Sequence, residues 1–530
     1  MKGATVLTTK AKKRKTTLGD FYWAYADILR GIGIPPATYD QRILAFMAVK
    51  LLIDNGKLSF NFEYQDQFGL SDTQYSIYKG KDTKATLLNI FNDLGNLGSA
   101  SLKYFDQEAK YNPGTETNVL HYINHKRVFP LTNYIEELPN NYLEMVLDIY
   151  TEKADFTDYP KEKYKDLYEK TVARMKKLSG DLTGQHFTQK SIIHLMCEYA
   201  IKEIKSNGKI AIYDPTCGTG SMIMESAYYF RRKVKGAKIE VYGQEYSGQL
   251  WILCKIFLEI CDFDDNGSGI NNIIAYGNTL TEPAFAQGIN GNDSFDFIIA
   301  NPPFGVDWKQ DYEAIIKNMI SPTPNFLTVW NGSKPITPKK SDGQFLFMMH
   351  ILQLMQQERA RGKRALAAVI SSSTLISTGS SNGSEAKIRH KIFTTGLLKG
   401  VLEQPNGMFT NTDISSHIWF FDSEHKETDT VKVIKADNDQ EPLYIPHPQP
   451  MDKMRQSYSL ANIKSVIKYM NQKRQHQYIT KNIAIQDRYS ININSEIDRK
   501  PDESLKDLAT IEREIRAHLQ SLIDSMQEHI

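Results

Sequence analysis

The sequence has few cysteines, almost no net charge and no long apolar run. Its four cysteines among 530 residues lack the paired spacing of a metal site and are too few to cross-link a chain of this size. No apolar run reaches the roughly 18 residues of a membrane-spanning helix, and the basic, Thr-rich start lacks the apolar core of a signal peptide. We therefore expect a cytoplasmic protein without disulfides, metal or a membrane anchor.

The charge balance also limits how the protein can bind nucleic acid. The net charge is only +2, from 64 basic and 62 acidic residues. A protein that holds DNA alone is often more basic, because phosphate contacts need cationic side chains. Any phosphate contacts are therefore expected to be shared with a partner chain. The remaining composition, 41% hydrophobic and 24% charged, is that of a globular protein with about three domains.

Changes in composition divide the chain into four segments. Residues 1–17 carry a basic cluster and are interpreted as a flexible tail. Residues 18–175 have apolar residues at helical spacing and predict a helical domain. In residues 176–445 strands alternate with helices, which predicts an α/β, doubly wound, mostly parallel sheet. Residues 446–530 are charged and helical, and their apolar seam at 508–526 would pack on the chain itself or dock to a partner.

The most informative stretch is FDFIIANPPFGVD, residues 295–307. An apolar run of strand length stops at two prolines, which remove two backbone donors. The polar tetrapeptide is therefore placed at the carboxyl end of a strand, where open α/β sheets bind ligands. The Asn301 side chain and the Pro302 carbonyl would be adjacent acceptors beside the flat ring of Phe304. Two acceptors and a stacking ring suit the exocyclic amine of a planar base.

A second candidate site is the glycine turn in KIAIYDPTCGTGSMIMESAYYF, residues 209–230. A strand ends at Asp214 and Pro215, and Gly218 and Gly220 permit a tight turn into the helix that follows. This arrangement brings backbone close to a nucleotide-like ligand. The segment is not a phosphate loop, because it lacks the Gly-Lys-Ser/Thr ending, and it does not match the GxGxxG pattern of dinucleotide sites.

Three further positions are candidates for the same site. Residues 184–188 in GDLTGQHFTQK form a loop before a helix, and their free backbone donors suit a carboxylate. Glu245 ends the strand IEVYGQE, where a carboxylate can accept both hydroxyls of a ribose. Asn278 ends a third strand, NIIAYGNTL. Residues 306–342 show little periodicity and predict a mobile loop near the site.

NPPF resembles the signature of the amino-methyltransferases that use S-adenosylmethionine: Asn or Asp, then Pro-Pro, then an aromatic residue. DPTCGTG resembles the cofactor motif of the same enzymes. GQHFT and the preceding DLYEKTVARM are similar to methylation subunits of type I restriction-modification systems, which are DNA adenine-N6 methyltransferases. The chain departs from that pattern at His186, Gln189 and Asn278, where Tyr, Pro and Asp are frequent. The resemblance covers most of the chain from about residue 160.

This resemblance implies a fold, a reaction and partners. The fold would be the class I S-adenosylmethionine-dependent one, with seven strands of which the last runs antiparallel. S-adenosylmethionine would be the cofactor, and its methyl group would pass to the N6 amine of an adenine flipped out of double-stranded DNA. The partners would be a DNA specificity subunit, with two methylation subunits to each, and a restriction subunit where the system has one. Because little of the chain follows the sheet, we expect the specificity subunit to read the DNA sequence.

The resemblance also implies the residues of each site. The catalytic ones are Asn301, Pro302, Pro303 and Phe304. The cofactor-binding ones are Gly184, Gln185, His186, Phe187, Thr188, Asp214, Pro215, Thr216, Gly218, Thr219, Gly220, Glu245, Asn278, Thr279, Leu280 and Asn301. Asp214 would meet the methionine ammonium and Asn278 would lie near the cofactor's adenine.

Three alternatives stay open. A cytosine-N4 DNA methyltransferase would use a related motif, although Ser-Pro-Pro is more usual there. A protein-glutamine methyltransferase also uses NPP and an aromatic residue, but such enzymes tend to be shorter. A catalytically silent scaffold would keep the fold for assembly alone, and complete motifs argue against it.

Overall fold

The computed structural model describes residues 18–35, 136–149, 188–204, 208–247, 271–286, 295–380, 382–409, 415–426, 430–437, 442–446, 456–472 and 479–484, together with a few single residues between them. The basic tail, residues 184–187 of the loop before the helix and the apolar seam at 508–526 lie outside the described residues. In the part of the chain that is described, no helix is long and apolar enough to cross a membrane.

Two helices are described in the N-terminal part, α1 (Leu18–Gly31) and α8 (Asn140–Asp148). Apolar residues of α1 recur at three- and four-residue steps, so one face of the helix is buried. The helices pack closely, since a Cβ atom on Gly31 would lie 3.5 Å from the Tyr142 ring. The helical domain at 18–175 otherwise stays a prediction, because most of it falls outside the described residues.

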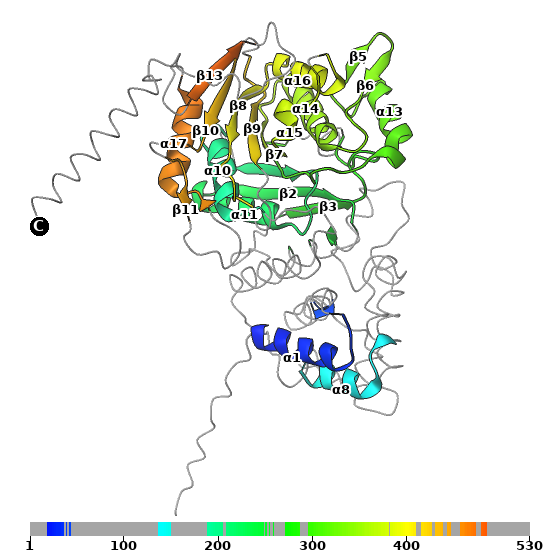
Figure 1. Cartoon of the computed structure of the whole chain (residues 1–530). Coiled ribbons are helices and arrows are strands. Elements are labelled where there is room, and N and C mark those ends of the chain that lie inside the picture. The colour runs from blue at the N-terminus through cyan, green and yellow to red at the C-terminus, as the bar shows by residue number, and fades with distance from the viewer. Residues whose placement is uncertain are drawn as a thin grey trace, which may run out of the picture.

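Among the described residues, nine strands form one sheet in the order β13-β10-β8-β9-β7-β4-β1-β2-β3 (Figure 1). Their bounds are β1 Lys209–Asp214, β2 Lys238–Glu245, β3 Asn271–Tyr276, β4 Phe297–Ala300, β7 Leu366–Ser372, β8 Leu398–Glu403, β9 Ser416–Asp422, β10 Thr430–Lys435 and β13 Ile479–Ala484. Strand β9 is antiparallel to β7 and β8, and β13 is antiparallel to β10. The other neighbours pair in parallel.

The predicted mostly parallel sheet is confirmed, but the count of seven strands is wrong for the sheet as it stands. The seven predicted strands lie in the order β3-β2-β1-β4-β7-β9-β8, with the antiparallel β9 between β7 and β8. Two strands extend the sheet beyond them. Strand β10 pairs with β8, and β13 pairs with β10. The extension covers the polar backbone edge that β8 would otherwise expose.

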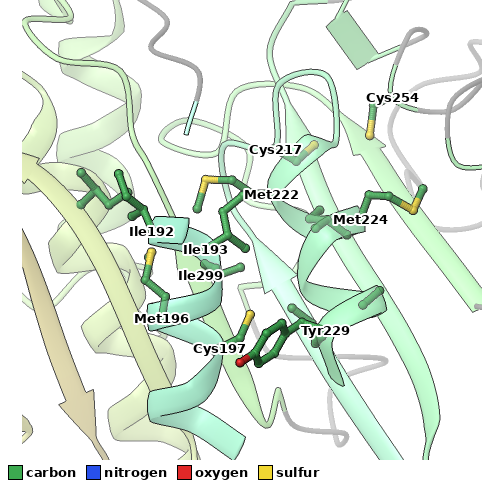
Figure 2. Packing of buried hydrophobic residues seen from close by; sticks show 14 of the residues in the cluster. Ile192, Ile193, Met196, Cys197, Cys217, Met222, Met224, Tyr229, Cys254 and Ile299 are labelled. Carbon is green, nitrogen blue, oxygen red and sulfur yellow. The ribbon is translucent and has the colours of Figure 1, made fainter. Parts of the chain in front are cut away.

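Alternate residues of the central strands face two separate hydrophobic layers, because successive side chains of a strand point to opposite faces. On β4, Phe297 and Ile299 belong to one layer and Ile298 and Ala300 to the other. The first layer, part of which Figure 2 shows, contains helices α10 (Lys190–Ile201), α11 (Ser221–Lys233) and α17 (Leu460–Asn471). The second contains α13 (Tyr312–Ile320), α14 (Gln344–Ala360), α15 (Thr374–Ser377) and α16 (Ser384–Thr394). Burial on both faces explains why these strands are apolar throughout.

Helix α17 and strand β13 are part of the sheet body. The helix begins at a capping box, in which Ser459 Oγ accepts the Asn462 N–H and Asn462 Oδ1 accepts the Ser459 N–H, both at 3.0 Å. It lies so close to β8 that a Cβ atom on Gly400 would be 2.6 Å from Met470 Sδ. The boundary expected at residue 446 therefore runs through this body, near the short pair β11 (Ile445–Pro446) and β12 (Gln456–Ser457). A docking role remains a proposal for residues after 484, which lie outside the described residues.

Residues 306–342 contain regular elements, so the prediction of an irregular loop is wrong, whereas its mobility stays a prediction. They contain the 3-10 helix η3 (Lys309–Asp311), helix α13 and a hairpin of β5 (Val329–Asn331) and β6 (Lys334–Ile336). The buried Trp308 anchors the two ends: its backbone N–H donates to the Lys340 carbonyl and its Nε1 to the Lys339 carbonyl, both at 2.9 Å. Short elements contain too few apolar residues to show a period, which explains the error.

Candidate active site

The carboxyl ends of β1, β2, β3 and β4 meet at one edge of the sheet. The parallel register places Asp214 of β1 opposite Gly243 of β2, and Glu245 of β2 opposite Tyr276 of β3. The polar residues that follow these strands are therefore neighbours, although they are far apart in the sequence. This edge is where an open α/β sheet binds its ligand.

The glycine turn after β1 is tied to the end of β2. The Cys217 N–H donates to the Gln244 carbonyl at 3.1 Å, and the Gly218 N–H donates to the Glu245 carboxylate at 2.8 Å. Gly218 and Gly220 have φ angles of 55° and 83°, conformations that favour glycine. The turn therefore follows the strand ends closely and leads directly into α11, as the sequence predicted.

Replacing Gly220 with alanine should destabilise the protein by more than backbone strain alone. A Cβ atom there would lie 2.6 Å from Cys254 Sγ. Gly236 provides a matched control, because its φ is 80° and nothing lies within 4 Å of the Cβ position. In urea unfolding we expect Gly236→Ala to lower the free energy of unfolding by about 1–2 kcal/mol, and Gly220→Ala by about 1–3 kcal/mol more. Adding Cys254→Ala should reverse part of the difference, and equal losses for the two glycine variants would contradict the close packing.

Two buried carboxyl groups lie beside the turn. Asp214 is 1% exposed, and burial raises its pKa to about 7, although the N–H and hydroxyl of Thr216 favour the carboxylate. Burial also raises the pKa of Glu245, against hydrogen bonds from the N–H groups of Gly218 and Ser247. Within the described ranges, neither acid forms an ion pair with a lysine or arginine. Buried acids of this kind suit a cationic ligand.

The loop after β3 is fixed by its own hydrogen bonds. Asn278 Oδ1 accepts the Leu280 N–H at 3.0 Å, and Asn278 Nδ2 donates to the Asp311 carboxylate at 3.1 Å. Thr279 Oγ1 donates to the Pro215 carbonyl at 2.6 Å, which joins this loop to the glycine turn. Both ends of the Asn278 amide are thus used within the protein. Asp311, which no sequence motif marked, supplies the carboxylate beside it.

The NPPF tetrapeptide follows β4 and contacts the residue that precedes α10 by two positions. Asn301 Nδ2 donates to Thr188 Oγ1 at 2.9 Å, across 113 residues of sequence. Thr188 Oγ1 in turn donates to Met222 Sδ, in the first turn of α11, at 3.2 Å. Pro302 is buried, whereas Asn301 and Phe304 are half-buried. One hydroxyl group therefore connects the tetrapeptide with the helix that follows the glycine turn.

Two residues near the tetrapeptide were not predicted to belong to the site. The ring of Phe409, in the loop after β8, lies edge-on to the ring of Phe304, with 6.5 Å between the centroids. Gln189 Nε2 donates to the backbone carbonyls of Met408 and Gln456, the latter at 3.1 Å. Proline, which the resemblance makes frequent at this position, has no side-chain donor and could not form these bonds. No local motif marks Phe409, because the sheet brings its loop to the tetrapeptide from a distant strand.

The predicted site residues that are described gather at this edge of the sheet. They are Thr188, Asp214, Pro215, Thr216, Gly218, Thr219, Gly220, Glu245, Asn278, Thr279, Leu280, Asn301, Pro302, Pro303 and Phe304. The other predicted residues, Gly184, Gln185, His186 and Phe187, lie outside the described residues. Where the structure describes the chain, no group of three or more His, Cys, Asp or Glu side chains could hold a metal ion.

Three solved structures resemble this one across most of the chain. The type I methyltransferase subunit of Streptococcus thermophilus is 17% identical, with a TM-score of 0.59, over 91% of this chain and 99% of that one. The modification subunit of a putative type I restriction enzyme of Vibrio vulnificus is 16% identical, with a TM-score of 0.53, over 89% and 94%. A structure concerned with assembly of a type I restriction-modification system is also 16% identical, with a TM-score of 0.51, over 96% and 97%. At these identities the likeness shows the fold.

The sequence itself identifies the family. The MpnII type I methylase subunit of Mycoplasma pneumoniae is 20% identical over 399 residues, which cover 72% of this chain and 68% of that protein. The HindI methylase subunit of Haemophilus influenzae is 26% identical over 272 residues, 51% of this chain and 53% of that protein. Residues 160–506 match the family described as N-6 DNA Methylase. Because that match covers more than half of the chain, the protein belongs to the N-6 DNA methylase family.

Proposed function

We propose that this chain is the methylation subunit of a type I restriction-modification system and transfers a methyl group from S-adenosylmethionine to the N6 amine of an adenine in DNA. The observation that carries the proposal is the hydrogen bond between Asn301 and Thr188. It joins the NPPF tetrapeptide to the loop that resembles type I subunits, beside the glycine turn. The relatives named above, which are type I methylase subunits, support the same assignment.

The residues at the sheet edge fit S-adenosylmethionine. Its ammonium and sulfonium groups are cationic, and Asp214 and Glu245 are buried acids. We assign the ammonium to Asp214 and the ribose hydroxyls to Glu245, whose carboxylate accepts two or three N–H groups and retains further acceptor capacity. Residues 184–188 would hold the methionine carboxylate, and the loop at Asn278 would lie near the adenine of the cofactor. When bound, this cofactor supplies an electrophilic methyl group.

The NPPF tetrapeptide would hold the target base. The adenine must leave the duplex, because its amine cannot be reached in the stack. Asn301 Oδ1 and the Pro302 carbonyl would accept the two amine protons, which leaves the nitrogen lone pair available for the methyl group. Phe304 would stack on the base, and the edge-on ring of Phe409 would limit where the base can lie. Positioning and fixed acceptors supply most of the rate, so no side-chain base is required.

Cofactor affinity should depend on pH through Asp214. Its pKa is raised to about 7 by burial, so in the free protein the carboxyl group is mostly protonated below that value and ionised above it. Only the ionised form attracts an ammonium group, so affinity should rise with pH, roughly tenfold from pH 6 to pH 7.5. Calorimetric titration with S-adenosylmethionine at several pH values measures this slope, and Asp214→Asn should weaken binding and flatten it.

A matched control for that titration is Asp296→Asn. Asp296 is also a carboxyl group whose pKa burial raises, but it precedes β4, at the opposite end of the strand from Asn301, and accepts the Ala211 N–H at 2.8 Å. This variant should lose some stability and keep the pH slope of cofactor affinity. A slope that survives Asp214→Asn would show that another group meets the ammonium.

The proposed partners follow from the same assignment. They are a specificity subunit that reads double-stranded DNA, with two methylation subunits to each specificity subunit, and a restriction subunit where the system has one. We place the complex in the cytoplasm. The similarity to the structure concerned with type I assembly supports the multi-subunit arrangement.

The proposed reaction is tested by identifying the modified base. The assembled enzyme is incubated with unmethylated DNA and S-adenosylmethionine labelled in its methyl group, and the DNA is digested to nucleosides. The label should appear in N6-methyldeoxyadenosine. Label in N4-methyldeoxycytidine, or in a protein glutamine, would overturn the proposal, and no label with any acceptor would favour a silent scaffold.

A further inference from the structure

We propose that Thr188 is a positioning residue, which determines which end of the Asn301 amide faces the target base. The inference rests on the function proposed above, in which Asn301 accepts a proton of the adenine amine. It gives Thr188 a task in the methylation step, in addition to the place near the cofactor that the sequence resemblance implied.

The two hydrogen bonds of Thr188 have fixed directions. A thioether sulfur can only accept, and an amide nitrogen can only donate. With Met222 Sδ at 3.2 Å and Asn301 Nδ2 at 2.9 Å, the hydroxyl proton points to Met222 and a lone pair points to Asn301. Thr188 and Met222 are 2% and 6% exposed, so water is poorly placed to replace either bond. The hydroxyl group therefore presents an acceptor, and no donor, to Asn301.

This polarity matters because the two ends of an amide have nearly the same size and opposite hydrogen-bonding character. With Asn301 Nδ2 held by Thr188, the oxygen occupies the other branch of the amide and can accept from the adenine amine. A rotated amide would place an N–H donor against the N–H donors of the base. Such an enzyme would still fold and bind its cofactor, but it would not make the amine nucleophilic.

Met222 makes this arrangement depend on the cofactor region. It lies in the first turn of α11, two residues after Gly220, the last glycine of the turn. Figure 2 labels Met222 together with Cys217, which belongs to the turn itself. The hydroxyl direction at Thr188 is therefore set by a residue of the helix that the glycine turn leads into. Thr188 thus links α11, which follows the glycine turn, with the NPPF tetrapeptide that would hold the base.

Variants of Thr188 separate orientation from packing. Thr188→Val keeps the shape and removes the hydroxyl, so Asn301 Nδ2 loses its bond to Thr188 and the amide can turn. In single-turnover assays with the assembled enzyme at saturating S-adenosylmethionine, we expect the methylation rate to fall about tenfold or more. This loss should exceed any loss of cofactor affinity, and the melting temperature should stay nearly unchanged. Thr188→Ser restores the hydroxyl and should recover the rate to within about threefold. Thr395→Val is the matched control, because Thr395 Oγ1 also donates one bond, to Ile392, and accepts one, from Leu397, at the end of α16.

A double-mutant cycle with Asn301→Asp distinguishes an orienting role of Thr188 from a role in packing alone. A carboxylate presents an acceptor at both ends, so it needs no orientation. In the Asn301→Asp background, Thr188→Val should therefore change the remaining rate less than twofold. If Asn301→Asp is inactive, the cycle uses Met222→Leu instead. Loss of the sulfur leaves the Thr188 hydroxyl proton without its acceptor, so the methylation rate should fall about threefold. Thr188→Val should then reduce the rate by a smaller factor in the Met222→Leu background than in the wild type.

The outcomes distinguish this inference from the proposed function. If the wild-type assembled enzyme forms no N6-methyladenine, the proposed function itself is wrong. If the wild type is active and Thr188→Val keeps its methylation rate, or loses rate only in proportion to cofactor affinity or stability, the inference about Thr188 is overturned. The inference is supported if Thr188→Ser recovers the methylation rate and if Thr188→Val reduces the rate less in the Asn301→Asp or Met222→Leu background than in the wild type.

Discussion

Replacing Asn301 with alanine should reduce methyl transfer by about a thousandfold or more, while affinity for S-adenosylmethionine stays within a few-fold. Asn301 follows β4 directly, and its amide is held by Thr188. In the proposed mechanism it is one of two acceptors that make the adenine amine nucleophilic. Its contribution is made in the reaction step, so the loss should appear in the rate constant rather than in cofactor binding.

Single-turnover methylation by the assembled enzyme, together with calorimetric cofactor titration, measures both quantities. Asn462→Ala is a suitable control, because Asn462 belongs to the capping box of α17 and its loss should cost about 1 kcal/mol of stability without changing the rate. Near-normal turnover of Asn301→Ala would end the proposed mechanism. Equal losses of rate and cofactor affinity would instead show that Asn301 acts mainly in cofactor binding.

The second large effect should be seen when the chain is purified alone. We expect it to bind S-adenosylmethionine but to methylate a defined DNA motif at least about a hundredfold more slowly than the complex with its specificity subunit. The net charge of +2 leaves few unbalanced cations for phosphate contacts, which a partner would have to supply. Specific recognition also needs side chains that read base edges in a groove.

The measurement compares methylation of a plasmid by the chain alone and after adding the specificity subunit. Heat-inactivated specificity subunit is the control for added protein. A deletion of residues 504–530, which contain the apolar seam, should impair assembly more than cofactor binding. Full activity of the isolated chain at one sequence motif would show that it recognises DNA by itself.

Local patterns predicted the centre of the fold and of the site. The apolar run before Asn301, with its two prolines, determines where β4 ends. Gly218 and Gly220 determine the turn into α11. Both motifs combine a buried strand with residues that cannot continue it, so each can be read within about a dozen residues. Parallel pairing then brings the strand ends together without further information.

The features that the sequence did not predict depend on contacts between distant segments. Phe409 reaches Phe304 because β8 and its loop are placed by the sheet. Asp311 reaches Asn278 because it lies in the segment 306–342, which Trp308 anchors. The two extra strands were missed for a related reason. Strand β10 has an alternating pattern, but only its pairing with β8 shows that it belongs to the same sheet.

The position of β9 between β7 and β8 has a consequence for synthesis of the protein on the ribosome. The chain makes β7 first, then β8, and only afterwards the strand that separates them. Until residues 416–422 have emerged, β7 can be paired on its β4 side alone, and β8 has no place in the sheet. A nascent chain of intermediate length therefore exposes the unpaired backbone groups of β7 and the apolar side chains of β8, which makes this stage of synthesis prone to aggregation.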